Sequence, residues 1–108
     1  MKKKTAGQIL ASATDHRYVI VTTQYRDLYC GLISASDAEI ASTHAVRVSE
    51  ARHIAYWQGP KGGLTSLAVE GPEDGSRIGA PIASMLVTGV AHVLDVTEAA
   101  RARFAAIQ

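Results

Sequence analysis

The sequence is short of the residues on which disulfides, metal cages and membrane spans depend. Among 108 residues there is one cysteine, one tryptophan and one phenylalanine, and only 6% of the chain is aromatic. The single cysteine, Cys30, excludes an internal disulfide and a cysteine-based metal cage, and its apolar surroundings predict a buried structural thiol. No apolar run approaches the roughly 20 residues that span a bilayer, and the residues after Lys4 are too polar for a secretory signal. We therefore expect a cytoplasmic location and no membrane partner.

An excess of charge of either sign is also missing. Eleven Lys and Arg against ten Asp and Glu give a net charge of +1. Such a balance provides no long-range attraction to nucleic acid, so we do not expect nucleic acid as a partner. The lysines at positions 2–4 are more typical of a solvated, mobile end than of a phosphate-binding arm. With 47% hydrophobic residues, the composition predicts one domain over residues 1–108 with a small core.

The motifs of common enzymes and metal sites are absent from the sequence as well. No two histidines have the i, i+4 spacing of a metal site, and there is no Gly-x-Ser-x-Gly elbow, no His-Glu-x-x-His motif and no pair of carboxylates flanking a motif. The glycine-rich stretch from Gly59 to Ser66 lacks the Gly-Lys-Ser/Thr step of a phosphate loop. We therefore expect a protein that is not an enzyme and holds no metal and no cofactor. Phosphodiester cleavage of a nucleotide is the least implausible reaction among the enzymatic alternatives.

Runs of β-branched and aromatic residues predict the strands, and short amphipathic segments predict the helices. The expected strands are residues 18–23, 28–33, 38–48, 52–58 and 81–96, and the expected helices are residues 5–13, 64–69 and 98–107. The internal Gly89 predicts that the last strand is bent or bulged, and Thr97 is a suitable N-cap for the last helix. The fold class is therefore α+β, with an antiparallel sheet or partly open barrel of about five strands and short helices.

The last predicted strand, residues 81–96, is apolar on both of its faces. Met85 and Val87 point to one side of the strand, whereas Leu86 and Val90 point to the other. A single small sheet buries only one face against its own core. We therefore expect the chain to form a homo-oligomer that covers the other face.

The segment that concentrates the most unusual residues runs from Arg52 to Gly59, with the sequence Arg-His-Ile-Ala-Tyr-Trp-Gln-Gly. Strand alternation places Arg52 and Tyr56 on one face and Trp57 on the other. Tyr56 and Trp57 provide a flat platform for a nucleobase, and Arg52 is suited to two-point contact with a phosphate. The alternatives stay open, because a Tyr-Trp pair also packs in cores and an arginine on a strand is often solvated or paired with an acid.

A glycine-rich turn follows directly and leads into a predicted helix. The turn, residues 59–63, exposes backbone amides and carries Lys61, and Thr65 and Ser66 stand in the first helical turn. Amides, a cation and hydroxyls near a helix N-terminus favour an anion, although such a loop is usually only a connection. A second cluster, residues 25–29 at the predicted hairpin tip, carries Tyr25 and Arg26, which suit recognition if they are exposed.

The order of these motifs resembles a family of small phage and prophage proteins described as a domain of unknown function. The specific part is the Arg-x-Ile-x-Tyr-Trp-x-Gly motif at 52–59 with the Leu-x-Ser-Leu-Ala helix at 64–68, and the resemblance covers roughly residues 18–104. Two departures affect the local loop: Ala55 stands where the family usually has an aromatic residue, and the turn at 59–63 is longer than the usual Gly-Ala step.

In size and style the chain also resembles viral sponges, which sequester nucleotide second messengers of bacterial immunity. That resemblance implies a homo-oligomeric binder of a cyclic dinucleotide or a cyclic ADP-ribose-type ligand, which it holds without cleaving. The alternative is a phage accessory factor that binds a host protein or associates with nucleic acid. A pocket lined by Arg52, Tyr56 and Lys61 at a subunit interface would favour the sponge, and a convex surface without pockets would favour the accessory factor.

Overall fold

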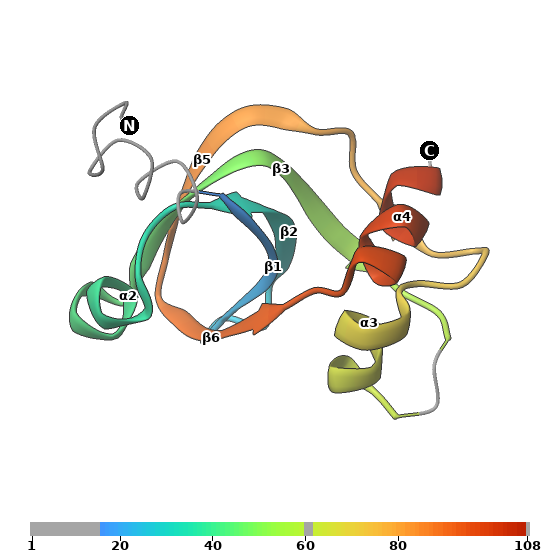
Figure 1. Ribbon diagram of the computed structural model, residues 1–108, viewed down its shortest axis with the longest axis horizontal. Coiled ribbons are helices and arrows are strands. Elements are labelled where there is room, and N and C mark those ends of the chain that lie inside the picture. The colour runs from blue at the N-terminus through green and yellow to red at the C-terminus, as the bar shows by residue number, and fades with distance from the viewer. Residues whose placement is uncertain (1–15, 60–61, 108) are drawn as a thin grey trace, which may run out of the picture.

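The computed structural model describes residues 16–59 and 62–107, and these form six strands and three short helices (Figure 1). The predicted α+β class is confirmed. The predicted helix at 5–13 and the lysines at 2–4 lie outside the described residues. The elements are β1 (Arg17–Thr23), β2 (Leu28–Ile33), α2 (Asp37–Thr43), β3 (Ala45–Tyr56), α3 (Leu64–Glu70), β4 (Arg77–Ile78), β5 (Ile82–Thr88), β6 (Val90–Asp95) and α4 (Glu98–Ala106).

All strand pairs are antiparallel, and the sheet curls into a partly open barrel. The order is β4-β3-β2-β1-β6, and β5 pairs with the first half of β3 while β4 pairs with its end. The strands β5 and β6 are one run bent at Gly89, which confirms the predicted bend. Gly89 has a φ of 67°, and an added Cβ would lie 3.0 Å from the Tyr25 ring, so glycine fits the corner for two reasons. The bend brings the sheet round into the ring visible in Figure 1.

The long strand β3 contributes to two separate cores because a bulge interrupts it. Leu32 pairs with Ser49 and Cys30 with Arg52, so β3 has one residue more than β2 between these pairs, and Glu50 has a φ of 52°. A bulge of this kind switches which side of the sheet each later residue faces. Two strands, at 38–48 and 52–58, were predicted from the sequence, but the structure has one strand over Ala45–Tyr56.

The two cores lie on opposite sides of β1 and β2. The barrel core, inside the ring, contains Val19, Val21, Ile33, Ile40, Val46, Val48, Ala51, Val87 and Val90. The helix-side core, beneath α3 and α4, contains Ile20, Cys30, Ile54, Leu67, Ala68, Ile78 and Phe104. Both faces of the central strands are therefore buried within one chain, and Cys30 is a buried free thiol as predicted.

Helix α2 stands where a strand was predicted, so the strand at 38–48 is wrong over its first residues. Ser36 and Glu39 form a reciprocal capping box, in which each side chain accepts a hydrogen bond from the other's backbone N–H. Two such bonds satisfy amides that a helix start leaves free, and they favour a helix at this point. The helix then ends at His44, whose left-handed conformation turns the chain into β3. Only Ile40 of α2 is buried, at one end of the barrel core.

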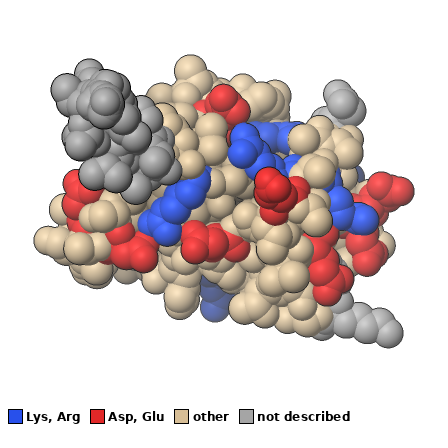
Figure 2. Space-filling model, in the orientation of Figure 1, with Lys and Arg blue, Asp and Glu red and all other residues tan. Residues whose placement is uncertain are grey.

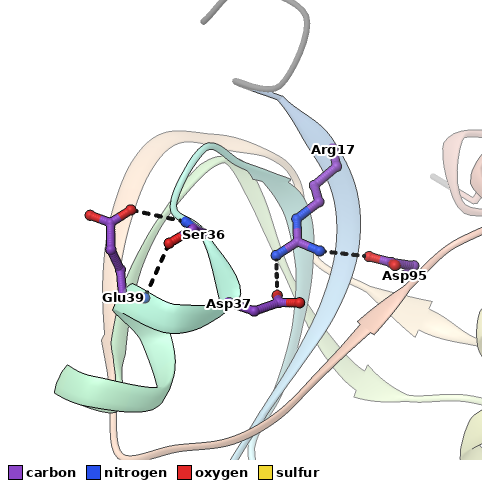
Figure 3. A network of polar contacts seen from close by, with 5 residues as sticks. All are labelled: Arg17, Ser36, Asp37, Glu39 and Asp95. Atoms are coloured by element: carbon purple, nitrogen blue, oxygen red, sulfur yellow. Dashed lines mark hydrogen bonds and ion pairs between the residues drawn. The ribbon is translucent and has the colours of Figure 1, made fainter.

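An arginine on β1 ties α2 to the sheet (Figure 3). The Arg17 guanidinium contacts the Asp37 carboxylate at the start of α2 and the Asp95 carboxylate at the end of β6, 3.1 Å away. The hydrogen bond to Asp37 raises the pKa of Arg17, so its charge is constant. Because both carboxylates are largely exposed, this network contributes modestly to stability and mainly fixes the position of α2.

Helices α3 and α4 form a close pair that covers the helix-side core. Thr97 caps α4 by accepting from the Ala100 N–H, as predicted, and its hydroxyl donates to the Val69 carbonyl at 2.6 Å. At Gly71 an added Cβ would lie 2.8 Å from the Arg103 Cβ, so the end of α3 approaches α4 too closely for any side chain. The segment at 73–80, predicted as a loop, carries the two-residue strand β4 that completes the edge of β3.

Candidate functional site

A cleft opens between α4, the bulge of β3 and the segment that leads into β5. Its volume is about 380 Å³. The residues that line it are Tyr18, Glu50, Arg52, Ala80, Pro81, Arg101, Ala105 and Ile107. Two guanidinium groups, a carboxylate and a phenol therefore meet apolar walls, which is the mixture that small-molecule sites use. We call this the α4 cleft.

Arg52 holds the base of the α4 cleft together. Its Nε donates to the Gly79 carbonyl at 2.6 Å, and a terminal nitrogen donates to the Phe104 carbonyl at 2.8 Å. The other terminal nitrogen donates to the carbonyls of Ile107 at 2.7 Å and Ile78 at 3.3 Å. One side chain thus joins the end of β4 to the last turn of α4, where a cation also complements the helix dipole. Most of the donors that were expected to hold a phosphate are engaged by backbone.

Arg101 is the other cation of the α4 cleft, and no hydrogen-bond acceptor among residues 16–59 and 62–107 engages its guanidinium. Its guanidinium carbon lies 4.9 Å from the centre of the Tyr18 ring, a cation–π geometry. Among the described residues, all ion pairs belong to Arg17, so neither Arg52 nor Arg101 is neutralised by a carboxylate within them. Both charges therefore contribute a positive potential to the cleft.

Tyr18 and Cys30 form a protonated pair under the cleft. The Tyr18 hydroxyl donates to the Cys30 sulfur at 3.3 Å, and burial raises the pKa of both groups. A thiol whose pKa is raised is a poor nucleophile. The pair therefore acts as a neutral floor to the cleft and offers no covalent chemistry.

The other residues of the expected nucleotide site do not gather around Arg52. Tyr56 is 52% exposed at the end of β3, opposite Arg77 of β4. Trp57 is half-buried against the helix-side core. Neither lines the α4 cleft. Their roles as a base platform stay predictions.

The glycine-rich turn is only partly described. Lys61 lies outside the described residues. Thr65 is exposed and Ser66 half-buried in the first turn of α3, a helix of seven residues whose N-cap, Gly63, provides no side-chain hydrogen bond. The prediction that they bind an anion is untested.

The hairpin tip carries the other predicted pair, Tyr25 and Arg26. Tyr25 is 69% exposed, the most exposed of the large apolar side chains described, and accepts from the Gln24 amide through its hydroxyl. Arg26 is exposed with a φ of 71°. The tip is fixed by Thr23, whose hydroxyl accepts from two backbone amides in the turn. This pair is available for recognition and lies apart from the residues of the α4 cleft.

Charge is dispersed over the face seen in Figure 2, where basic and acidic side chains alternate. No group of three His, Cys, Asp or Glu among residues 16–59 and 62–107 is placed to hold a metal ion. None of the helices in these ranges is long and apolar enough to cross a membrane.

Sequence reasoning missed three residues of the α4 cleft: Tyr18, Glu50 and Arg101. Tyr18 was assigned to a strand and Arg101 to the last helix, and nothing local indicates that these elements meet. The only available signal was the pair Arg101 and Ala105, which an i, i+4 spacing places on one face of α4. Glu50 had none, because its position depends on the bulge.

Comparison with known proteins gives a family for this architecture. The model of a domain of unknown function, DUF6948, matches residues 16–104, which is most of the chain. The chain belongs to the DUF6948 family. The predicted membership in a domain-of-unknown-function family is thereby confirmed, and the DUF6948 match covers every described strand and nearly all of α4. Neither a curated protein nor a solved structure matches the chain. The expected phage origin and the likeness to viral sponges stay predictions.

Proposed function

We propose that this DUF6948 domain is a non-catalytic binding protein that holds a nucleotide-type signal molecule in the α4 cleft without cleaving it. The observation that carries the proposal is the meeting of Arg101, Arg52 and the Tyr18 ring in one cleft. Guanidinium groups bind phosphate oxygens, and an aromatic ring paired with a guanidinium offers a surface for stacking. The ligand is thus proposed to lie against α4, and not on Tyr56 and Trp57 as the sequence suggested.

The size of the cleft limits the ligand. About 380 Å³ is near the lower end of the 300–1,000 Å³ typical of small-molecule sites. It suits one nucleotide unit per copy, so a cyclic dinucleotide would extend beyond a single cleft. The walls formed by Pro81, Ala105 and Ile107 are apolar and match a base or ribose face.

The test incubates the full chain with a panel of cyclic dinucleotides and cyclic ADP-ribose isomers, removes the protein, and denatures it to recover what was bound. Wild type is expected to deplete one ligand and return it intact. Arg101→Ala is expected to weaken binding roughly tenfold or more, which corresponds to about 1.4 kcal/mol. The matched control is Arg77→Ala, because Arg77 is exposed on β4 outside the cleft. A converted product would indicate an enzyme, and no depletion by wild type would refute the proposal.

The hairpin tip supports the alternative, an accessory factor that binds a host protein. The specific observation is the exposure of Tyr25 beside Arg26, two residue types that dominate binding energy at protein interfaces. If no ligand of the panel binds, Tyr25→Ala should abolish capture of a host protein that wild type retains. The homo-oligomer expected from the sequence also remains a proposal, and β5 gives it a specific form.

A further inference from the structure

One edge of the curled sheet is left open at β5. On one side β5 pairs with β3 through six residue pairs, from Ala45–Thr88 to Ala51–Ile82. No strand in the described part of the chain pairs with its other side. In Figure 1 β5 lies at the outer rim with β3 beside it. An open edge presents unpaired backbone N–H and C=O groups that can extend the sheet into another chain.

The usual protections of an open edge are missing from β5. Proteins protect such edges with lysines, prolines, bulges or inward-pointing charges. Residues 78–94 contain no Asp, Glu, Lys or Arg, and the only proline near the strand, Pro81, precedes it. The first three residues of β5, 82–84, are all exposed, so the strand is accessible from both faces at this end.

The exposed apolar side chains of β5 are also left uncovered by the part of the chain that the structure describes. Ile82 is 50% exposed and Leu86 is 54% exposed, although the same run places Val87 in the barrel core. Much of the rest of the apolar run is covered within the chain, since Val90 is buried and Leu94 packs against the helix-side core. The excess apolar surface that predicted an oligomer is thus concentrated on β5.

We propose that β5 pairs with β5 of a second copy in an antiparallel, two-fold arrangement with Ser84 of both copies at the axis. In this register Ile82 of each copy lies opposite Leu86 of the other, and Ala83 lies opposite Met85. Each exposed apolar side chain therefore meets its complement, and cross-strand pairs of this type stabilise antiparallel sheets. A two-fold pairing needs a strand that is complementary to itself, and β5 carries no charged side chain of its own; the nearest charge is the Arg47 guanidinium of β3, which donates to the Ser84 hydroxyl at 3.1 Å.

The occupant is a second copy because nothing on the strand selects a different partner. Recognition of a foreign strand generally uses charge or a side-chain pocket, and residues 78–94 offer no charge. Two exposed apolar side chains per copy and one row of backbone bonds form a contact at the low end of specific interfaces. The dimer is therefore concentration-dependent.

Disulfide trapping tests the register directly. Ser84→Cys in the full chain is expected to give a covalent dimer of twice the 11.4 kDa chain mass on mild oxidation. Two variants serve as controls: Met85→Cys lies one residue from the axis, and Ser42→Cys lies on the exposed surface of α2. The native Cys30 is buried and does not compete. Equal cross-linking of all three variants, or cross-linking only through position 85, would overturn the proposal.

A charge on the edge tests the interface without a cross-link. Leu86→Lys is expected to raise the dimer dissociation constant at least roughly tenfold in analytical ultracentrifugation, because an ammonium group then replaces the apolar contact of Leu86 with Ile82 of the second copy. Val69→Lys is the matched control, since Val69 is 56% exposed on α3. A monomeric wild type at its highest soluble concentration would refute the inference, as would a dimer that Leu86→Lys leaves intact. Leu86→Glu, with the opposite charge, should also give a monomer in ultracentrifugation. Circular dichroism should show that both charged variants are folded, which excludes local unfolding as the reason for the monomer.

Discussion

Replacing Arg52 should destabilise the fold rather than remove only a ligand contact. Its four hydrogen bonds reach the carbonyls of Ile78, Gly79, Phe104 and Ile107. A hydrogen bond to a charged group typically contributes about 1.5–3 kcal/mol, but four bonds from one half-buried side chain are not additive. Water also replaces part of what is lost. We expect Arg52→Ala to lower the free energy of unfolding by about 2–4 kcal/mol.

Arg52→Lys separates charge from geometry. A lysine keeps the positive charge at the end of α4, but its single nitrogen cannot reach both β4 and α4 as the planar guanidinium does. We therefore expect about half of the loss seen with alanine. If Arg52 made only the two-point phosphate contact that the sequence suggested, Arg52→Lys would weaken ligand binding and leave the stability of the apo protein unchanged, so the two interpretations give different outcomes.

The assay is urea unfolding followed by circular dichroism, with Arg47→Ala as the matched control. Arg47 lies on the same strand and makes one exposed hydrogen bond, to the Ser84 hydroxyl at 3.1 Å. That control should stay within about 0.5 kcal/mol of wild type. In thermal unfolding Arg52→Ala should lower Tm by roughly 8–32 °C, because each kcal/mol shifts Tm by about 4–8 °C for domains near this size. If Arg52→Ala is as stable as the control, the clamp between β4 and α4 is wrong.

Four further substitutions probe the fold. Gly31→Ala should lower the free energy of unfolding in urea by about 1–3 kcal/mol, because an added Cβ would lie 2.7 Å from the Ser49 carbonyl oxygen in the β3 bulge. A stability equal to wild type would contradict this close contact between β2 and β3. Trp57→Ala should lower the free energy of unfolding by about 2–3 kcal/mol, less than the loss of a fully buried Trp. Tyr56 is half-exposed, so Tyr56→Ala should lower it by under about 1 kcal/mol. The reverse order would mean that Tyr56, and not Trp57, packs in the core. Burial raises the pKa of Cys30 above its ordinary value of 9.0, so the native state keeps a proton that the unfolded chain loses. The contribution of Cys30 to the free energy of unfolding is therefore complete below about pH 9 and falls above it by about 1.4 kcal/mol per pH unit. Cys30→Ala should reduce this slope when unfolding is measured from about pH 8 to 10.5.

Local patterns predicted those parts of the fold that local chemistry decides. The hairpin of β1 and β2, the bend at Gly89 and the Thr97 cap each depend on residues within a few positions of one another. Helix α2 was missed although Ser36 and Glu39 carry the spacing of a capping box, because the β-branched residues of β3 favoured a strand through the whole segment. The capping-box signal for a helix was present in the sequence, but the strand propensity of the residues after it was given more weight.

The candidate site depends on contacts between distant parts of the chain, and these were not predictable. The carbonyls that engage Arg52 lie 26 to 55 residues along the chain from it. Strand alternation predicts that Arg52 and Tyr56 share one face of β3, but it carries no information about α4, which closes over Arg52. The bulge at Glu50, which sets the faces of both residues, has no sequence signature of its own.

The passage of β3 through both cores has a consequence for cooperativity. Val46 and Val48 pack inside the ring and Ile54 packs beneath the helices, yet they belong to one bulged strand. Neither core can lose its packing without freeing a strand on which the other depends. The domain should therefore unfold in a single transition, with the fluorescence of Trp57 at the helix side and the far-UV circular dichroism of the whole sheet changing at the same urea concentration. In native-state hydrogen exchange, the amides of β3 on either side of the bulge should open together, as one folding unit.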